Sequence, residues 1–425
     1  MLKLPKLKSY NGTIKIQGDK SIGHRAFIIS ALANGTSRIY NSPKSMDLLS
    51  TMSCLESLGI EMTHNIDFIE VRGVNKNNFR ASKNILNANN SGSTIRMLSG
   101  ILSAQNFSTT ITGDESLQSR PMMRIIEPLK LMGADIISKH NYAPLTFIPV
   151  KNLNGINYKL KIPSAQVKSA LIFAGMFAEG ETSVSENILT RNHTENILGL
   201  KTEITNDGFK TTVNNKFNFP SLKNFIIPND PSSAAFVIAL SILSSKSEIT
   251  IPNVCINPTR IKFIEVLKSI GANINFINVR DNYREPVADI VVKSSVIFGD
   301  MIINEDMLPS LIDEIPILAV ISLFKNGIFK LTGAKELRVK ESDRISAVCF
   351  NLRKLGVEVD EYEDGFAFEG LDSYKGVEFS SFNDHRIAMA FAIAGMKIGN
   401  SSIDNEEIAN ISFPTFFDIV KLFSE

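Results

Sequence analysis

The apolar positions of the chain repeat one pattern where helices are expected to end. Segments 54–62 (CLESLGIEM), 128–137 (PLKLMGADII), 266–274 (VLKSIGANI) and 351–359 (NLRKLGVEV) each place two apolar residues three apart, followed by a glycine. Residues three apart share a helix face, and a glycine after the last turn can take the left-handed conformation that ends the helix. Alternating positions typical of a strand follow each glycine. The pattern predicts helices that end at glycine and lead directly into strands.

The spacing of these glycines predicts an internal repeat. They fall at 59, 133, 271 and 356, and segment 196–204 (NILGLKTEI) is a weaker copy in the longest gap. Six units of about 70 residues account for this spacing. The alternative is that such helix ends recur by chance, as they can in any α/β protein.

The two ends of the chain complement each other in this repeat. Segment 12–18 (GTIKIQG) is a strand with no helix before it, and the final helix has no strand behind it. We therefore expect the N-terminal strand to complete the last unit. This predicts a discontinuous C-terminal domain of residues 1–15 plus 230–425 and an inserted N-terminal domain of residues 16–229. Hinges are expected near residues 12–20 and 226–231.

Composition agrees with a two-domain globular protein and excludes several classes. The chain has 425 residues, of which 44% are hydrophobic and 21% charged, and 45 Lys and Arg balance 44 Asp and Glu. Because the net charge is +1, we expect no nucleic acid and no membrane as a partner. The start lacks a secretory signal, and three scattered cysteines and five histidines suggest neither disulfides nor a metal site. These features predict a cytoplasmic protein.

A basic turn precedes the first expected helix. In 17–25 (QGDKSIGHR), Lys20, Ser21 and Arg25 lie where a strand passes into a helix, and free backbone N–H groups favour anions there. A phosphate or carboxylate ligand is one interpretation, and an exposed basic turn is the other. His24 alone is more typical of a structural histidine.

Similar small polar or basic turns begin several later helices. They hold Asn90, Gly92 and Ser93 in 89–98, Arg120 in 113–124, Ser164, Ala165 and Gln166 in 161–180, Arg191 in 189–198, and Ser232 and Ser233 in 227–240. Each one alone could be an ordinary helix cap. Their recurrence suggests helix N-termini that converge on one anion-binding cleft.

Carboxylates also stand before apolar helices. Asp313 and Glu314 in 308–320 (LPSLIDEIPILAV) could be caps, or one could be a general base beside a basic cleft. Asp384, His385 and Arg386 in 383–395 (NDHRIAMAFAIAG) leave the same two possibilities open.

Segment 337–344 (LRVKESDR) mixes charges of both signs. If it is helical, Lys340, Glu341 and Arg344 lie within about 100° of one another, and Arg338 and Asp343 fall outside that arc. The first three could face a ligand while the other two stay a solvated helix start.

Seven motifs in order resemble the enolpyruvyl transferases along essentially the whole chain. They are GDKSIGHR, NSGSTIRML, SAQVKSALIFAG, NPTR (257–260), LIDEIPILAV, LRVKESDRI and NDHRIAMAFAIAG. The resemblance implies a two-domain α/β fold, the inside-out α/β barrel. It has six βαβαββ-type units, three per domain, with the active site in the interdomain cleft.

The resemblance also implies a reaction. The enolpyruvyl group of phosphoenolpyruvate passes to the 5-hydroxyl of shikimate 3-phosphate by addition and elimination, and phosphate is released. No metal or organic cofactor is implied, and a monomer is expected. The sister family that acts on UDP-N-acetylglucosamine is the nearest alternative, but it uses a loop cysteine near Arg120 that segment 113–122 lacks. A catalytically silent scaffold that binds anions is a further alternative.

The matching positions imply roles for individual residues. Shikimate 3-phosphate contacts are Ser21, Arg25, Ser164, Ala165, Gln166, Arg191 and Lys340. Phosphoenolpyruvate contacts are Lys20, Gly92, Arg120, Arg344 and Arg386, with Lys20 and Gln166 able to touch both substrates. Asn90, Ser93 and His385 complete the expected substrate-binding set. Asp313 is the expected base at the hydroxyl, Glu341 exchanges the carbon proton, and Lys20 could share the proton transfers.

Three positions depart from the resemblance: Ile411, Asn229 in place of a usual glycine, and Asn192 where aspartate is common. Many relatives carry a lysine before the C-terminal SFP, whereas this chain has Ile411. One cation fewer is therefore available for phosphoenolpyruvate. Gly92 leaves room beside the expected phosphoenolpyruvate site, which predicts inhibition by the mimic glyphosate.

Overall fold

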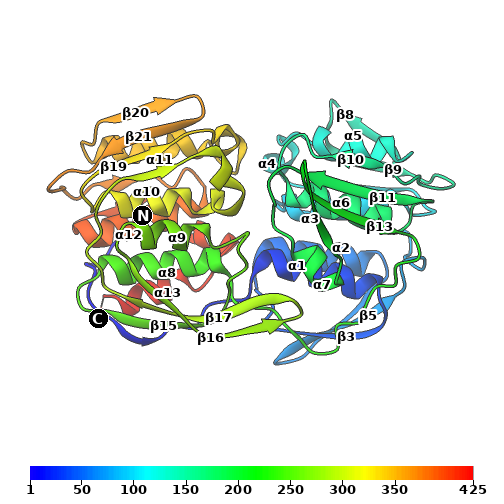
Figure 1. The fold of residues 1–425 in the computed structure, drawn as a ribbon, viewed down its shortest axis with the longest axis horizontal. Coiled ribbons are helices and arrows are strands. Elements are labelled where there is room, and N and C mark those ends of the chain that lie inside the picture. The colour runs from blue at the N-terminus through cyan, green and yellow to red at the C-terminus, as the bar shows by residue number, and fades with distance from the viewer. Residues whose placement is uncertain (425) are drawn as a thin grey trace. The chain divides into compact units, whose positions relative to one another are not determined.

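The chain divides into two compact units, drawn in Figure 1. The structure is a computed structural model, and it describes residues 1–424. Unit 1 comprises Met1–Gln17, Asn229–Asp281 and Pro286–Glu425, and unit 2 comprises Gly18–Pro228 and Asn282–Glu285. Each unit is described below by itself.

Three helices pack together inside each unit. In unit 1 they are α8 (Pro231–Leu243), α10 (Ile315–Ser322) and α12 (His385–Ile398), and in unit 2 they are α1 (Lys20–Leu32), α3 (Gly92–Leu102) and α6 (Ala165–Gly175). All residues of α8 and α10 are buried. A helix that is apolar on every side belongs in a protein core or a membrane. In residues 1–424 no helix combines the length and apolar character that a membrane span requires.

Each central helix contacts a sheet of its own. The sheets of unit 2 are β14 (Phe225–Ile226)–β3 (Asn34–Tyr40)–β5 (Phe68–Val74)–β4 (Glu61–His64), β6 (Leu86–Asn87)–β7 (Thr109–Thr112)–β9 (Tyr142–Ile148)–β8 (Asp135–Lys139) and β10 (Asn157–Lys159)–β11 (Glu181–Glu186)–β13 (Gly208–Asn214)–β12 (Thr202–Thr205). Those of unit 1 are β16 (Asn273–Asn282)–β17 (Glu285–Lys293)–β15 (Glu248–Cys255)–β2 (Asn11–Thr13), β18 (Met301–Ile303)–β19 (Ile328–Leu331)–β21 (Gly365–Glu369)–β20 (Val359–Tyr362) and β1 (Leu2–Lys3)–β23 (Ser402–Ile403)–β22 (Glu378–Phe379).

The sheets confirm the predicted six-unit, inside-out architecture. In the unit of β6 and α3, the first strand runs parallel to β7, and β9 pairs antiparallel with both β7 and β8. The order along the chain is strand, helix, strand, helix and two strands, and three of the other four-stranded sheets have the same strand order. In the remaining one, β14 from the end of unit 2 takes the place of the first strand and pairs in parallel with β3. The helices therefore lie inside and the sheets lie outside.

The prediction for the N-terminal strand is wrong in one respect. Strand β2 pairs in parallel with β15, so it is the first strand of the unit that contains α8. The last sheet is closed instead by β1, whose Leu2 pairs with Ile403. The alternating Ile14 and Ile16 are buried, at 2% and 6% exposure. The alternation of apolar and polar residues predicts which side chains are buried, but it does not predict which sheet the strand joins.

The glycine pattern is confirmed at all five helix ends. The helices are α2 (Met46–Ser57), α5 (Met123–Leu131), α7 (His193–Leu198), α9 (Lys262–Ser269) and α11 (Arg344–Lys354). Their glycines have φ values from +69° at Gly199 to +97° at Gly271. At α2, the N–H of Gly59 bonds to the Glu56 carbonyl at 2.9 Å, and the next N–H bonds to the Leu55 carbonyl at 3.1 Å. The same bond pair recurs at each end and is the Schellman motif.

Candidate active site

Lys20 begins α1 in unit 2 and is paired with a carboxylate. Asp19 caps the helix by accepting the Ile22 N–H at 2.8 Å, so the capping role belongs to Asp19 rather than to Ser21. The Lys20 ammonium lies 2.6 Å from Asp47 on α2. Sequence reasoning missed Asp47, because an acidic residue in the first turn of a helix is an ordinary complement to the helix dipole.

Arg25 is buried, so the interpretation of an exposed basic turn is wrong. Its exposure is 3%, and its guanidinium donates to Thr194 Oγ1 at 2.8 Å, to Ser169 Oγ at 2.9 Å and to the Ser21 carbonyl at 2.8 Å. Burial lowers the pKa of Arg25 to about 10, and the carboxylate of Glu195 acts against this shift.

Arg191 joins the same group of unit 2 residues. It donates to Ser21 Oγ at 3.3 Å, and Arg25 reaches the Ala165 carbonyl at 3.4 Å. The structure therefore brings Ser21, Arg25, Ala165 and Arg191 together around the N-termini of α1 and α6.

Gln166 links α6 to α3. Its carbonyl oxygen accepts from Arg96 Nη1 at 2.8 Å, and its amide donates to Ser93 Oγ at 2.9 Å. Ser164 precedes it as the helix cap and accepts the Val167 N–H at 3.4 Å. The capping alternative thus holds for Ser164, whereas Gln166 holds two side chains of another helix.

Gly92 lies against two guanidinium groups, and a side chain at this position would crowd them. A Cβ there would lie 2.9 Å from Arg96 Nη1 and 3.6 Å from Arg120 Nη1. Arg120 donates to Asn90 Oδ1 at 2.6 Å and to Ser116 Oγ at 3.1 Å. Ser91, and not Gly92, caps α3. Because Gly92 has no side chain, a ligand can come close to the backbone there.

A buried chain of side chains connects the starts of these helices. His24 Nδ1 lies 2.7 Å from Thr51 Oγ1, which lies 2.7 Å from Thr94 Oγ1. Thr94 in turn lies 3.3 Å from the backbone carbonyl of Asp47. Burial lowers the pKa of His24 to about 3, so its imidazole is neutral and structural, as expected.

In unit 1 the predicted acids and arginines meet at Arg344. This side chain is 1% exposed and lies 2.8 Å from Asp384, 2.7 Å from Glu341 and 3.5 Å from Asp313. Burial opposes its charge, but the three carboxylates outweigh burial and raise its pKa above the ordinary value. Burial likewise raises the pKa of Asp384, but Arg344 more than offsets it, so the net shift is downward.

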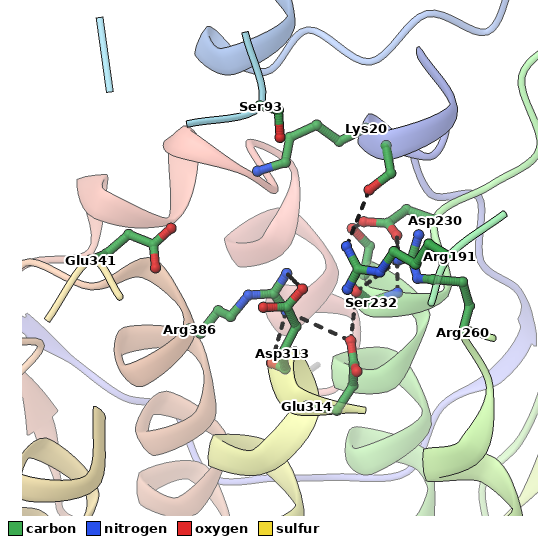
Figure 2. Close-up of polar contacts among 12 residues, drawn as sticks. Lys20, Ser93, Arg191, Asp230, Ser232, Arg260, Asp313, Glu314, Glu341 and Arg386 are labelled. Atoms are coloured by element: carbon green, nitrogen blue, oxygen red, sulfur yellow. Dashed lines mark hydrogen bonds and ion pairs between the residues drawn. The ribbon is translucent and has the colours of Figure 1, made fainter. Parts of the chain in front are cut away.

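Arg386 lies against Asp313, as Figure 2 shows. It donates to the Asp313 carbonyl at 3.0 Å, and its guanidinium lies 3.8 Å from the carboxylates of both Asp313 and Glu314. Unit 1 therefore places Asp313, Glu341, Arg344 and Arg386 in one cluster. His385 is buried at the start of α12, and Lys340 is half-buried before Glu341.

Glu314 is a part of this cluster that sequence reasoning left undecided. It is 2% exposed and accepts from Ser232 Oγ at 2.5 Å, and Ser232 also accepts from Arg260 at 3.1 Å (Figure 2). Burial raises the pKa of Glu314, and Arg386 acts against that shift. Glu314 occupies the N-cap position of α10, but its side chain makes no capping hydrogen bond there.

Segment 337–344 is not one helix, so the helical-wheel prediction is wrong. A 3-10 helix covers Lys335–Val339, and α11 begins only at Arg344. Asp343 caps α11 by accepting the Ser346 N–H at 3.0 Å and binds Arg338 at 2.8 Å. Glu341 reaches Arg344 from the intervening bend. Arg338 and Asp343 are structural, but they are paired rather than solvated.

A sequence model of the family described as EPSP synthase (3-phosphoshikimate 1-carboxyvinyltransferase) matches residues 5–420. The chain belongs to the EPSP synthase family. The proteins of this name from Petrotoga mobilis and Chlorobaculum tepidum are 43% and 44% identical, over 97% and 95% of this chain and 96% of each relative. The structure of the Acinetobacter baumannii EPSP synthase has a TM-score of 0.86 and 37% identity, covering 99% of this chain and 97% of that one. These names support the shikimate branch of the resemblance and not the UDP-N-acetylglucosamine branch.

Ile411 is a distinctive position of this EPSP synthase family member. It ends the 3-10 helix Glu407–Ile411 and is half-buried. The next residue, Ser412, accepts a hydrogen bond from the side-chain amide of Gln17 through its backbone carbonyl. An aliphatic side chain here supplies no charge to an anionic ligand.

Proposed function

We propose that this member of the EPSP synthase family transfers the enolpyruvyl group of phosphoenolpyruvate to the 5-hydroxyl of shikimate 3-phosphate and releases phosphate. The observation that carries the proposal is the unit 1 cluster, in which Asp313 and Glu341 both face the buried guanidinium of Arg344. Arginines suit carboxylate and phosphate groups, and two carboxylates provide the two proton-transfer groups that the reaction needs.

The binding groups are divided between the substrates. Shikimate 3-phosphate binds Ser21, Arg25, Ser164, Ala165, Gln166, Arg191 and Lys340, and phosphoenolpyruvate binds Lys20, Gly92, Arg120, Arg344 and Arg386. Asn90, Ser93 and His385 line the same sites. The clustering of these residues within each unit supports this division.

The reaction proceeds in two steps. Asp313 takes the proton of the 5-hydroxyl, the oxygen attacks C2 of phosphoenolpyruvate, and Glu341 gives a proton to the methylene carbon. In the second step Glu341 takes a proton back from the new methyl group, the C2–O bond to phosphate breaks, and the enol ether remains. Arg344 lies 2.7 Å from Glu341 and favours its anionic form, so Glu341 gains its proton only after the substrates bind. Lys20 can share these proton transfers.

The two units act as the domains of the enzyme, with hinges near residues 12–20 and 226–231. We expect a cytoplasmic monomer that glyphosate inhibits, because at Gly92 no side chain displaces the guanidinium groups of Arg96 and Arg120. The chemistry itself requires no cofactor, since both proton transfers fall to side chains of the chain.

Phosphate release tests the proposal. The purified protein is incubated with phosphoenolpyruvate and shikimate 3-phosphate, with each alone, and with phosphoenolpyruvate and UDP-N-acetylglucosamine. Phosphate release only in the mixture of phosphoenolpyruvate and shikimate 3-phosphate supports the proposal. Release only with the last pair would assign the sister activity, and no release in any mixture would favour a silent anion-binding scaffold.

A further inference from the structure

A lysine is buried inside the apolar core helix α6 of unit 2. The side chain of Lys168 is only 1% exposed, and it lies among the apolar residues that surround the helix. An ammonium group taken out of water has to be paired, because the loss of hydration is otherwise too costly. The proposed mechanism assigns Lys168 no role.

The Lys168 ammonium holds one short segment at three points. It lies 2.5 Å from Glu186 Oε1 and 2.8 Å from Glu195 Oε1, and it donates to the Thr190 carbonyl at 3.3 Å. Thr190 Oγ1 also donates to the second Glu186 oxygen at 2.6 Å. Glu186 is the last residue of β11, and Glu195 lies in the first turn of α7. One charge therefore ties both ends and the middle of the connection 187–192.

This connection carries Arg191. Arg191 directly follows Thr190, and its guanidinium reaches Ser21 Oγ at 3.3 Å. Thr194, the neighbour of Glu195, accepts from Arg25 Nε at 2.8 Å. Lys168 thus lies behind both arginines of the expected shikimate 3-phosphate group and contacts the backbone next to one of them.

A loop arginine loses much conformational freedom when it binds an anion, and a pre-ordered loop reduces that cost. Buried ion pairs, by contrast, often add little net stability over apolar replacements. We infer that Lys168 is a positioning residue, which fixes the segment from Glu186 to Glu195 so that Arg191 is held ready for shikimate 3-phosphate. This inference rests on the proposed function.

The principal test is Lys168→Met, studied by phosphate release with each substrate varied in turn. We expect the KM for shikimate 3-phosphate to rise about tenfold, or about 1.4 kcal/mol, while the KM for phosphoenolpyruvate stays within about twofold. Lys262→Met removes an exposed lysine paired with Glu265 at 2.6 Å and should leave both constants unchanged. An unchanged KM for shikimate 3-phosphate, or equal rises in both constants, would overturn the inference. A wild-type protein without turnover would instead overturn the proposed function.

A double-mutant cycle with Arg191→Ala separates positioning from general stability. If Lys168 acts through Arg191, Lys168→Met should change the KM for shikimate 3-phosphate by less than about twofold when Arg191 is already alanine. Full additivity of the two effects would refute this route.

A charge-balanced variant keeps the test available if Lys168→Met alone does not fold. Lys168→Met with Glu186→Gln removes one ammonium and one carboxylate, and it keeps Glu195, the carboxylate that favours the charge of Arg25. A folded double variant with the KM for shikimate 3-phosphate still raised supports positioning. A return to the wild-type KM would show that only charge balance matters, and would overturn it.

Discussion

Replacing Gly92 with alanine tests whether phosphoenolpyruvate needs the close approach of Arg96 and Arg120 to this glycine. The new Cβ would lie 2.9 Å from Arg96 Nη1, closer than ordinary packing permits, and 3.6 Å from Arg120 Nη1, an ordinary contact. Because the crowded atom is the end of a flexible side chain, the guanidinium of Arg96 can move away. Its bond to Gln166, now 2.8 Å long, is then stretched or lost.

The size of the effect follows from that bond. A hydrogen bond to a charged group contributes about 1.5–3 kcal/mol, so losing half or more of it reduces kcat/KM for phosphoenolpyruvate about tenfold. The free energy of unfolding should fall by no more than about 2 kcal/mol, because the better helix propensity of alanine, about 1 kcal/mol, offsets part of the lost bond. The KM for shikimate 3-phosphate should rise less, since Gln166 keeps its bond to Ser93.

Phosphate release at saturating shikimate 3-phosphate gives the KM for phosphoenolpyruvate and the inhibition constant for glyphosate. Glyphosate has one more atom than phosphoenolpyruvate between its carboxylate and its phosphorus, so it is longer. Its inhibition constant should therefore rise more than the KM for phosphoenolpyruvate. Gly180→Ala is the control, because its φ of +84° brings backbone strain while its Cβ meets nothing within 4 Å. If Gly92→Ala left both constants at wild-type values, the claim that phosphoenolpyruvate binding requires a glycine beside these guanidinium groups would be refuted.

Three further predictions use other features of the site and fold. Glu341→Gln should abolish turnover while calorimetry shows nearly unchanged substrate binding, and near-normal turnover would contradict its role as proton carrier. Gly356→Ala should lower the free energy of unfolding by about 1 kcal/mol with activity intact, because φ is +82° and its Cβ meets nothing within 4 Å. Denaturant titration measures this loss, and a loss several times larger would show that backbone strain is not the only cause. Because the pKa of His24 is lowered from 6.5 to about 3, the unfolded chain binds a proton that the folded chain refuses, and stability falls as pH drops through this window. His24→Asn should flatten this slope, which approaches about 1.4 kcal/mol per pH unit below about pH 6, and an unchanged slope would contradict the argument.

Local signals in the sequence predicted local structure well. The glycine that ends a helix depends on residues only a few positions away, so all five Schellman ends could be anticipated. Strand β2 was assigned to the wrong sheet because its partner is more than 200 residues away, and alternation does not encode that choice. Segment 337–344 was read as a helix because Asp343 was not recognised as a cap that interrupts it.

Sequence reasoning missed the residues that pair with the expected substrate-binding side chains, and not those side chains themselves. Asp47 resembles any acidic residue in a first helical turn, and its pairing with Lys20 is set by tertiary packing. Lys168 did carry a signal, because a lone lysine within an apolar helical run requires a buried counter-ion. The sequence could not indicate that the counter-ions would be Glu186 and Glu195.

The closure of the last sheet by β1 has a consequence for biosynthesis. Leu2 and Lys3 are made about 400 residues before their partners Ile403 and Ser402. At about 5–20 residues per second, the N-terminal segment waits roughly 20–80 s for its pairing. Unit 2 is nearly contiguous, and all strands of its three sheets are complete by residue 226. Only segment 282–285 follows later, so the unit can begin to fold during that wait. Unit 1, with its very long-range pairing, is expected to be the slower of the two and the more exposed to aggregation during synthesis.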